Sequence, residues 1–396
     1  MKQRFTKIAA ILLAGVMMCG CAANNSGSGA ETSTAVTEEA AAPVIDRGEM
    51  RGLDAKSLVS EMKTGWNLGN SLDATGADET SWGNPVTTQE MIDAVKAQGF
   101  DVLRVPVTWG NHMGEAPDYT VEPEWMERVA EVVDYGIADG MYVIINTHHE
   151  PDTWLLPQSK SMDEVVPQLT ALWQQIAERF ADYGDHLVFE GLNEPRVKGI
   201  PEEWTGGTED GRACVNKLNR VFYDTVRATG GNNAQRLLLI STYAQQVTMD
   251  AFRDFDTDYD EYTGVALHAY TPYSFTYHNG ESWELFKWDG SEKKSIEAVF
   301  KMMDKYVLSK DIPVIITEYG SVTKTIPDEM IYNNDEVVKW VNDYLSVAKE
   351  YGVPCVWWDN NQYYSGNEHF GIFNRSELTW YSPKVADAII ANYQEQ

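Results

Sequence analysis

The segment from residue 87 to residue 107, TTQEMIDAVKAQGFDVLRVPV, contains the pattern from which the fold can be inferred. Residues 87–90 form a capping-box sequence, apolar residues follow at helical spacing, and Gly99 is placed to end the helix. Residues 102–107 come directly afterwards and are apolar almost throughout, which is typical of a strand that is buried on both faces. A helix followed at once by a buried strand is the repeating unit of an α/β fold.

The same pattern recurs along the chain. A second capping-box sequence, Ser161-x-x-Glu164, opens a helical pattern that runs to Gly184, and further patterns carry Trp125, Leu218 and Trp340. The expected strands are residues 64–68, 102–107, 142–146, 187–191, 236–241, 264–268, 313–317 and 354–357. Eight strands alternating with helices predict a parallel sheet closed into a (β/α)₈ TIM barrel. We expect one domain over residues 44–396.

The N-terminal residues are expected to be a targeting segment rather than part of the fold. Residues 1–20 join a positively charged start to an apolar run too short to span a bilayer, as in a signal peptide. Met18-Cys19-Gly20-Cys21 resembles a lipoprotein processing box, which predicts a lipid anchor on Cys21; secretion with Cys21 unmodified is the alternative. Residues 21–43 lack large apolar side chains and predict a flexible tether. Together these features predict a secreted, cell-surface lipoprotein.

Composition excludes several classes of partner. The formal net charge of −29 disfavours nucleic acid, whereas a neutral polymer meets no such repulsion. Beyond the leader, Cys21, Cys214 and Cys355 form no C-x-x-C pair, so no disulfide framework is expected, and Cys214 and Cys355 are expected to be buried free thiols. We expect a monomer that meets a membrane only through Cys21.

Polar and aromatic side chains gather where the expected strands end, which in a parallel barrel is where catalytic groups lie. These residues are Asn67, Arg104, His148, His149, Asn193, Glu194, His268, Tyr270, Glu318, Trp358 and Asp359. Glu194 and Glu318 follow the fourth and seventh strands, so they could face one another across the barrel mouth. Retaining glycosidases need two carboxyl groups about 5–5.5 Å apart. For either glutamate alone, an ion pair that closes the barrel end is the structural alternative.

The residues around these glutamates resemble the motifs of a known family. Asn193-Glu194-Pro195 and Thr317-Glu318-Tyr319-Gly320 look like the two catalytic motifs of glycoside hydrolase family five. The match extends through Gly65-Trp66-Asn67-Leu68-Gly69-Asn70, Thr80-Ser81-Trp82-Gly83-Asn84-Pro85, Arg104-Val105-Pro106, His148-His149, Leu267-His268-Ala269-Tyr270-Thr271-Pro272-Tyr273 and Trp357-Trp358-Asp359-Asn360. Together they resemble subfamily four over roughly residues 50–392.

The resemblance implies a retaining endo-β-1,4-glucanase that acts by double displacement on cellulose, mixed-linkage β-glucan or xyloglucan. It implies Glu194 as acid/base and Glu318 as nucleophile. Mannanase or xylanase activity on the same scaffold stays open, as does a cell-surface protein that binds glycans without cleaving them. No G-x-S-x-G nucleophile elbow and no phosphate-binding glycine loop is present in the sequence, which argues against a serine hydrolase and a nucleotide-dependent enzyme.

The neighbouring residues have expected roles in holding the sugar or the carboxylates. Asn193 is expected to bind the sugar 2-hydroxyl, and Arg104 and Tyr270 to hold Glu318. His268 is expected to support Tyr270 or the acid/base. Asn67, His148 and His149 complete the expected sugar contacts.

His148-His149-Glu150 invites a metal interpretation, but H-E-x-x-H is absent from the sequence and no third residue shows helix-type ligand spacing. We therefore expect neither a metal nor a cofactor.

Aromatic side chains are expected to bind sugar rings, whose C–H faces can lie on an aromatic plane while the hydroxyl groups stay in water. Trp358 is the first candidate, whereas Trp357, its neighbour on the strand, is expected to point into the core. Trp82, Trp109 and Tyr273 are further candidates for subsites. The aromatic-rich loop 273–288 is expected either to form a wall of the site or to pack on itself.

Overall fold

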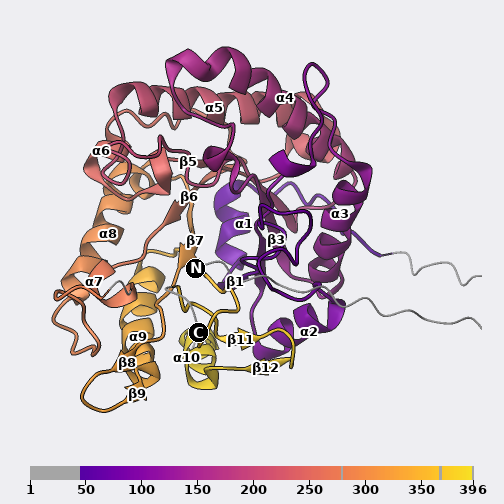
Figure 1. The fold of residues 1–396 in the computed structure, drawn as a ribbon. Coiled ribbons are helices and arrows are strands. Elements are labelled where there is room, and N and C mark those ends of the chain that lie inside the picture. Colours follow the sequence, from indigo (N-terminus) through magenta and orange to yellow (C-terminus); the bar gives the residue numbers. More distant parts are fainter. Residues whose placement is uncertain (1–44, 278–279, 365–367, 395–396) are drawn as a thin grey trace, which may run out of the picture. The chain divides into compact units, whose positions relative to one another are not determined.

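The computed structural model describes residues 45–277, 280–364 and 368–394. In it eight parallel strands close into a barrel in the order β1-β10-β7-β6-β5-β4-β3-β2 (Figure 1). The barrel strands are β1 (Thr64–Asn67), β2 (Val102–Val105), β3 (Tyr142–Asn146), β4 (Leu187–Glu190), β5 (Leu238–Ser241), β6 (Thr263–His268), β7 (Val314–Tyr319) and β10 (Cys355–Trp357). Each coincides with one of the eight expected runs, and every strand residue is buried. The predicted (β/α)₈ fold is confirmed.

Helices surround the barrel as an outer layer (Figure 1). They are α2 (Gln89–Gln98), α3 (Pro123–Ala138), α4 (Met162–Arg179), α5 (Glu209–Ala228), α6 (Met249–Arg253), α8 (Lys293–Tyr306), α9 (Asn334–Glu350) and α10 (Pro383–Gln394). Trp125, Leu218 and Trp340 all face the core, as their helical spacing predicts. Within the described part of the chain, no helix combines the length and the hydropathy needed to cross a membrane.

The two expected capping boxes do not form, although both helices do. The N-cap of α2 is Thr88 rather than Thr87, and its side chain makes no capping hydrogen bond. The helix begins one residue later than expected, so Glu90 occupies its second position. A capping box requires the glutamate at the third position, where its side chain can accept a hydrogen bond from the N–H of the N-cap residue. Ser161 is the N-cap of α4 but has helical backbone angles and also makes no capping bond.

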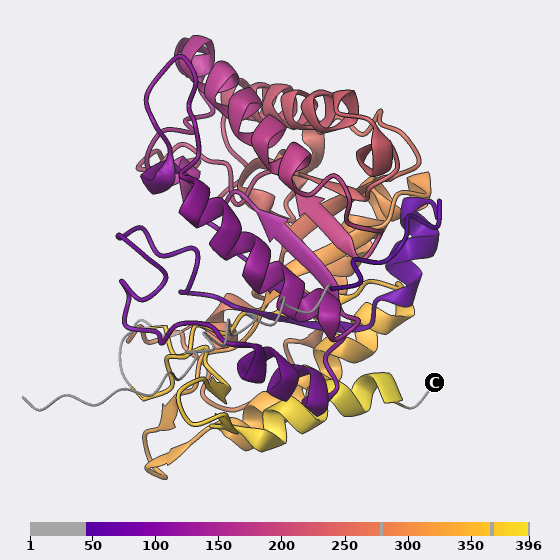
Figure 2. The ribbon, with the colours of Figure 1, turned by 90° about the vertical axis from the view of Figure 1, so that its right-hand side faces the viewer.

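One end of the barrel is closed by the short helix α1 (Ala55–Glu61). Its residues Leu58 and Val59 pack against the barrel-interior residues Val102, Ile144 and Leu239, and the backbone N–H of Ala55 donates to the carbonyl of Glu261. Figure 2 shows α1 at one end of the barrel, away from the hairpin of β8 (Thr325–Ile326) and β9 (Ile331–Tyr332). Because α1 contacts the region where the strands begin, the open end is the one where they finish.

The loops at the open end carry small elements that the sequence did not predict. The loop after β6 contains α7 (Tyr273–Thr276). The loop after β7 contains the hairpin of β8 (Thr325–Ile326) and β9 (Ile331–Tyr332), and the loop after β10 contains the hairpin of β11 (Phe373–Asn374) and β12 (Thr379–Trp380). Elsewhere, Cys214 and Cys355 are buried and unpaired, as expected.

The expected leader, the tether and Cys21 lie outside the described residues, and the boundary expected at residue 44 stays a prediction.

Candidate active site

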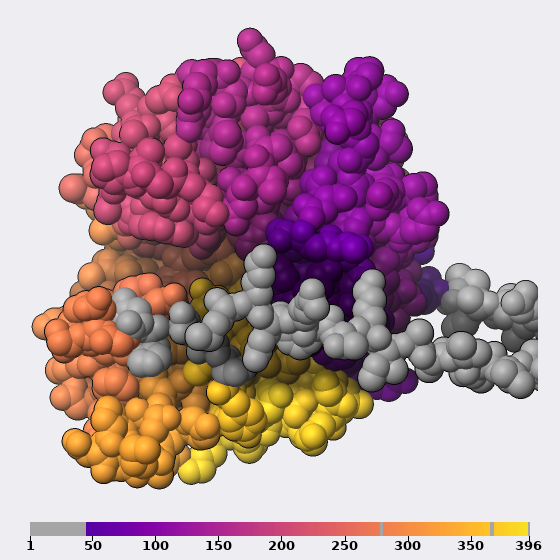
Figure 3. All heavy atoms as spheres, viewed as in Figure 1, coloured from indigo at the N-terminus to yellow at the C-terminus, as the bar shows by residue number. Residues whose placement is uncertain are grey.

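A groove of about 840 Å³ lies at the open end of the barrel and contains both glutamates, Glu194 and Glu318. In Figure 3, which looks onto this end of the barrel, the magenta part of the chain forms the upper side of the face and the orange-to-yellow part forms its lower side. Of the expected site residues, His148, His149, Asn193, His268, Tyr270, Tyr273 and Trp358 also line the groove. The topology therefore brings together residues that are up to about two hundred positions apart.

Glu318 lies near the end of β7, and two neighbours hold its carboxylate in place. Arg104 donates from Nη1 to Oε1 at 2.8 Å, and the Tyr270 hydroxyl donates to Oε2 at 2.8 Å. Burial and the adjacent Glu318 raise the pKa of Tyr270 well above its usual value, so the phenol keeps its proton and remains a donor. With both oxygens bonded to donors, the Glu318 carboxylate is held in one orientation.

Arg104 is the centre of a buried network beneath the groove. It binds Glu190 through two hydrogen bonds, of 2.6 and 3.1 Å, and also donates to Asn67 Oδ1 at 2.9 Å and Asn193 Oδ1 at 2.8 Å. Burial by itself lowers the pKa of Arg104, but Glu190 and Glu318 outweigh it and hold the pKa above its usual value. One guanidinium thus fixes both the proposed nucleophile and the neighbouring Asn193.

The expectation that Asn67 contacts sugar is wrong, because its side chain is fully buried, and the equally buried Arg104 binds Glu318 instead of sugar. Arg104 is enclosed by the carboxylates that it binds. The Asn67 amide donates to the carbonyls of Thr317, Val356 and Trp357 and so joins three strands. Both residues act on the groove only through other side chains.

Glu194 follows β4 in a strained backbone conformation, with φ at 41°. Its N–H donates to Gln245 Oε1 at 2.8 Å, which ties the loop after β4 to the loop after β5. His268 Nδ1 lies 3.0 Å from Oε1 of Glu194, and Arg196 Nη1 lies 3.4 Å from Oε2. His268 therefore supports the Glu194 carboxylate, one of the two roles expected for it.

The surroundings of Glu194 act on its proton affinity in opposite directions. Burial alone raises the pKa, but the hydrogen bond and charge of His268 and the positive charges of Arg196 and His149 outweigh burial. The pKa of Glu194 consequently lies below the usual value. This lowered pKa favours the ionised form of the carboxyl near neutral pH.

The two carboxylates are close enough to act on the same bond. An oxygen of Glu194 and an oxygen of Glu318 lie within 4.8 Å of one another, with His268 between them. Glycosidases that retain configuration have carboxyl groups about 5–5.5 Å apart, whereas inverting enzymes need about 6.5–9.5 Å for an intervening water. The separation fits direct attack by one carboxylate.

One wall of the groove is built around the two adjacent histidines. His148 stacks on Trp358 with ring centroids 5.7 Å apart and parallel planes, and burial lowers its pKa well below the usual value, so it is neutral. His149 lies edge-on to Trp82, which is 38% exposed. Trp82 and Trp358 are thus near the groove, whereas Trp357 is fully buried as expected.

The expectation that Trp109 lines a subsite is wrong. Trp109 is fully buried, and its indole N–H donates to the carbonyl of Asn146 at 2.8 Å. Its backbone N–H donates to the buried carboxylate of Glu150, which also accepts from Gly110 and Trp154. Both polar groups of Trp109 are used to join the loops after β2 and β3, and that holds the ring in the core.

The aromatic loop 273–288 does both things that were considered for it. Tyr273 and Tyr277 line the groove and stack on one another with centroids 4.8 Å apart. Phe275 and Trp288 instead pack together in the core. The buried Lys324 donates to backbone carbonyls of this loop, at Ser274 and Leu285. The described parts of this loop, residues 273–277 and 280–288, therefore form a wall of the groove with a packed underside.

Several groove residues were not predicted, and some of them had a signal. Arg196 directly follows the Asn-Glu-Pro motif, and its guanidinium lies over the ring of Trp204 at 4.6 Å. Glu190 is a carboxylate inside an otherwise apolar strand, a pattern that demands a buried partner. Glu368, a third carboxyl in the groove, belongs to a long loop and had no comparable signal.

Among the residues that the structure describes, two groups of side chains have ligand atoms close enough to surround a metal: Asp73 with His148 and His149, and Glu194 with His268 and Glu318. In the second group, Arg104 and Tyr270 already bind the oxygens of Glu318, and His268 is bound to Glu194. A carboxylate held by a guanidinium and a phenol is arranged as a nucleophile more than as a ligand. The expectation of no metal stays a prediction.

Replacing Arg104 by Met should lower the free energy of unfolding by about 3–5 kcal/mol, since it leaves Glu190 and Glu318 as uncompensated buried charges. Denaturant unfolding of the purified variant measures the loss. Arg104→Lys keeps the charge but cannot reproduce the two-pronged bond to Glu190, so it should lose less. A loss below about 1 kcal/mol for Arg104→Met would show that the network is not needed for stability.

Comparison with known proteins agrees with this geometry. The family described as cellulase, glycosyl hydrolase family 5, matches residues 67–364. Endoglucanase A of Ruminococcus albus is 56% identical over 351 residues, which are 87% of this chain and 94% of that protein.

Two solved structures resemble this chain closely. A family-five xyloglucan-specific endo-β-1,4-glucanase from a metagenomic library, in complex with cellotriose, has a TM-score of 0.81 at 44% identity, covering 85% of this chain and 98% of the other. A "GH5-4 broad specificity endoglucanase" from Ruminococcus champanellensis with bound cellotriose has a TM-score of 0.81 at 41% identity, covering 87% and 100%. The subfamily label of the second agrees with the motifs of this sequence. The chain therefore belongs to the cellulase family, glycosyl hydrolase family 5.

Proposed function

We propose that the protein is a retaining endo-β-1,4-glucanase in which Glu318 is the nucleophile and Glu194 the acid/base. The observation that carries the proposal is the pair of carboxylates within 4.8 Å of one another in an open groove. Only Glu318 has both oxygens fixed by a cation and a phenol donor. Glu194 instead contacts His268, a group that can exchange a proton.

In the first step, Glu318 attacks the anomeric carbon and forms a covalent glycosyl ester while the bond to the leaving oxygen breaks. The protonated form of Glu194, which the second step regenerates, gives its proton to that oxygen, so the rest of the chain leaves as an alcohol. Asn193 lines the groove and shares the Arg104 guanidinium with Glu318, which supports a role in binding the 2-hydroxyl of the reacting sugar. Arg104 and Tyr270 keep Glu318 from rotating away during the attack.

In the second step, water replaces the departed sugar. Glu194, now ionised, takes a proton from that water, which attacks the anomeric carbon and releases Glu318 as a carboxylate. The lowered pKa of Glu194 keeps the carboxylate ionised at this stage, so it is free to accept the proton. Two inversions at one carbon restore the original configuration.

A neutral β-1,4-linked glucan fits the groove best. The aromatic rings of Trp358, Tyr273 and Tyr277 offer faces for sugar rings, and the chain's formal charge of −29 disfavours acidic polymers. The similar proteins named above are an endoglucanase, a xyloglucan-specific glucanase and a broad-specificity endoglucanase. We therefore propose cellulose, mixed-linkage β-glucan and xyloglucan as substrates, with cleavage inside the chain.

The first-formed sugar should have the β configuration at its new end. Proton NMR recorded within the first minutes of hydrolysis, before mutarotation, distinguishes the β product from the α product that inversion would give. The same reactions on carboxymethylcellulose, mixed-linkage β-glucan, xyloglucan, xylan and mannan, with products sized over time, test the substrate. Fastest turnover of mannan or xylan would contradict the proposed class.

We also propose that the protein is secreted, is anchored at the cell surface through Cys21 and acts as a monomer. The support for export is the charged and apolar leader, and the support for anchoring is the processing box that ends at Cys21. A large, neutral polymer cannot enter a cell, so its hydrolysis requires an enzyme placed outside.

A further inference from the structure

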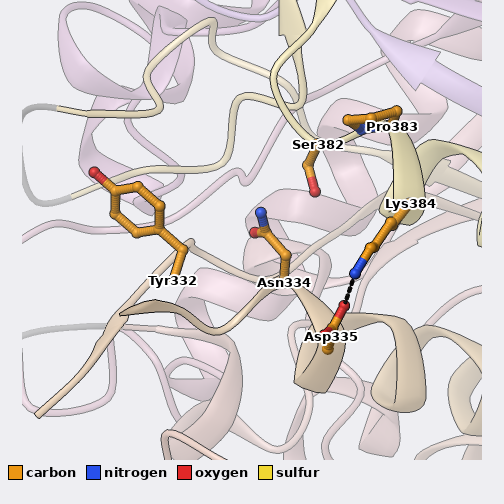
Figure 4. Close-up of a pocket in the computed structure, with 6 residues that line it drawn as sticks. All are labelled: Tyr332, Asn334, Asp335, Ser382, Pro383 and Lys384. Atoms are coloured by element: carbon orange, nitrogen blue, oxygen red, sulfur yellow. Dashed lines mark hydrogen bonds and ion pairs between the residues drawn. The ribbon is translucent and has the colours of Figure 1, made fainter. Parts of the chain in front are cut away.

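A second pocket, of about 260 Å³, lies between the start of α9 and the start of α10 (Figure 4). It is lined by Tyr332, Asn334, Asp335, Ser382, Pro383 and Lys384, none of which lines the catalytic groove. The volume is slightly below the 300–1,000 Å³ that is usual for sites of drug-sized ligands. Such a space suits one or two sugar units better than a long segment of a polymer.

Two buried polar atoms in this pocket have no partner. Ser382 is 1% exposed, and neither its Oγ nor the Oδ1 of Asn334 makes a hydrogen bond with any described residue. Figure 4 shows the Asn334 amide and the Ser382 hydroxyl pointing toward one another across the pocket. Buried polar groups without partners are rare in proteins, and a bound water, ion or other small molecule is one way in which they are satisfied. Here a ligand needs both a hydrogen-bond donor and an acceptor.

The charged residues of the pocket do not select a charged ligand. Lys384 Nζ lies 2.6 Å from Asp335 Oδ1, so the two charges compensate one another. The unsatisfied groups, a hydroxyl and a side-chain amide oxygen, are neutral. Neutral hydroxyl groups, which can both donate and accept, complement this lining.

Tyrosine rings are exposed next to the pocket. Tyr332 is 44% and Tyr364 67% exposed, and their ring centroids lie 6.2 Å apart. Tyr363, which accepts a hydrogen bond from Asn334, stacks on Tyr381 with centroids 5.0 Å apart and supports the exposed rings from below. Exposed aromatic rings with polar edges are suited to the C–H faces of sugar rings. We call Tyr332, Tyr363, Tyr364 and Tyr381 the tyrosine cluster.

We propose that the pocket and the tyrosine cluster form a second, non-catalytic binding site for a β-glucan chain. The choice of β-glucan rests on the proposed function; the sugar chemistry itself rests on the exposed rings and the neutral, unpartnered polar atoms. The loop after β10 also connects the two sites, because it carries Glu368 and Phe370 to the catalytic groove and Tyr364 to the cluster. A polymer held at the second site would stay near the groove between cleavage events.

The test compares variants of the full chain that carry Glu318→Gln, so that bound polymer is not consumed. Tyr332→Ala with Tyr364→Ala should weaken retention by mixed-linkage β-glucan in affinity electrophoresis by about fivefold, the size expected for loss of a stacking contact. Tyr332→Phe with Tyr364→Phe keeps the rings and should retain most of the affinity. Met330→Ala, which removes another exposed apolar side chain from the same hairpin, should have no effect.

Activity and mass measurements separate the possible outcomes. In the chain with Glu318 intact, the double alanine variant should cleave a small aryl cellobioside at the wild-type rate but degrade polymer more slowly at low polymer concentration. Unchanged polymer affinity in the double alanine variant would overturn the proposal, as would an equal loss in Met330→Ala. A change in sedimentation of the double variant would instead identify the patch as an interface between two copies. Absence of any β-glucan hydrolysis by the unaltered protein would refute the proposed function separately.

Discussion

Replacing Glu318 by Gln should reduce hydrolysis of β-1,4-glucans by about 10⁴-fold or more, the scale seen when a covalent nucleophile is removed. The amide is nearly the same size and can still accept a hydrogen bond from Arg104 or Tyr270, so the fold should persist. It cannot form the glycosyl ester. Release of reducing sugar from mixed-linkage β-glucan measures the loss, and circular dichroism checks the fold.

Glu368→Gln is the matched control for Glu318→Gln. Glu368 is a carboxyl in the same groove, and its pKa is raised by burial and by the nearby Glu194 and Glu318. It contacts neither Arg104 nor Tyr270, so its amide variant should keep activity within about tenfold of the original. If Glu318→Gln retained a tenth of the activity, or if Glu368→Gln lost as much, Glu318 would not be the nucleophile.

Replacing Glu194 by Ala should affect substrates according to their leaving groups. Polymers need a proton on the departing oxygen, so their cleavage should fall by about 10²–10⁴-fold. Dinitrophenyl cellobioside has a leaving group that departs without a proton, so its first step should be nearly unaffected. The second step still lacks its base, and a rapid burst of dinitrophenol followed by slow turnover is therefore expected. Stopped-flow absorbance records both phases.

Glu194→Gln provides the second variant, because it preserves the shape of the side chain and its contact with His268. It should show the same dependence on the leaving group as Glu194→Ala, since neither side chain can supply the proton. Equal loss on the polymer and on the dinitrophenyl substrate, with no burst, would assign the acid/base role to another residue.

The barrel could be predicted because its strands are short, apolar and separated by helices with clear stop signals, as in residues 87–107. Strands buried on both faces leave little choice of residue, so the pattern is strong. The two small hairpins after β7 and β10 were not predicted. Strands of two residues are too short to show a period. Phe373 and Ile326 are buried, but both residues of Ile331–Tyr332 are exposed, so no periodic signal exists to find.

The site could be predicted by position but not by depth. Strand ends identified Glu194, Glu318, Arg104 and Tyr270 correctly as neighbours, because topology alone brings strand ends together. The sequence could not show that Asn67 and Trp109 are fully buried, because their burial depends on how far the loops fold over the strand ends. A tryptophan beside a groove and one beneath it have the same sequence context.

The backbone around Glu194 implies a conflict between stability and catalysis. Glu194, Ala244 and Gln245 all have left-handed φ values, of 41°, 52° and 52°, and such conformations cost about 1–3 kcal/mol each for residues other than glycine. Glycine would relieve that strain at each position, yet at Glu194 it would remove the acid/base itself, and at Gln245 the amide that binds Glu194. Selection for a more heat-resistant form of this enzyme, natural or directed, therefore favours substitutions at Glu194 and Gln245 that would inactivate it. Screening for stability alone would select against the residues that make the groove reactive.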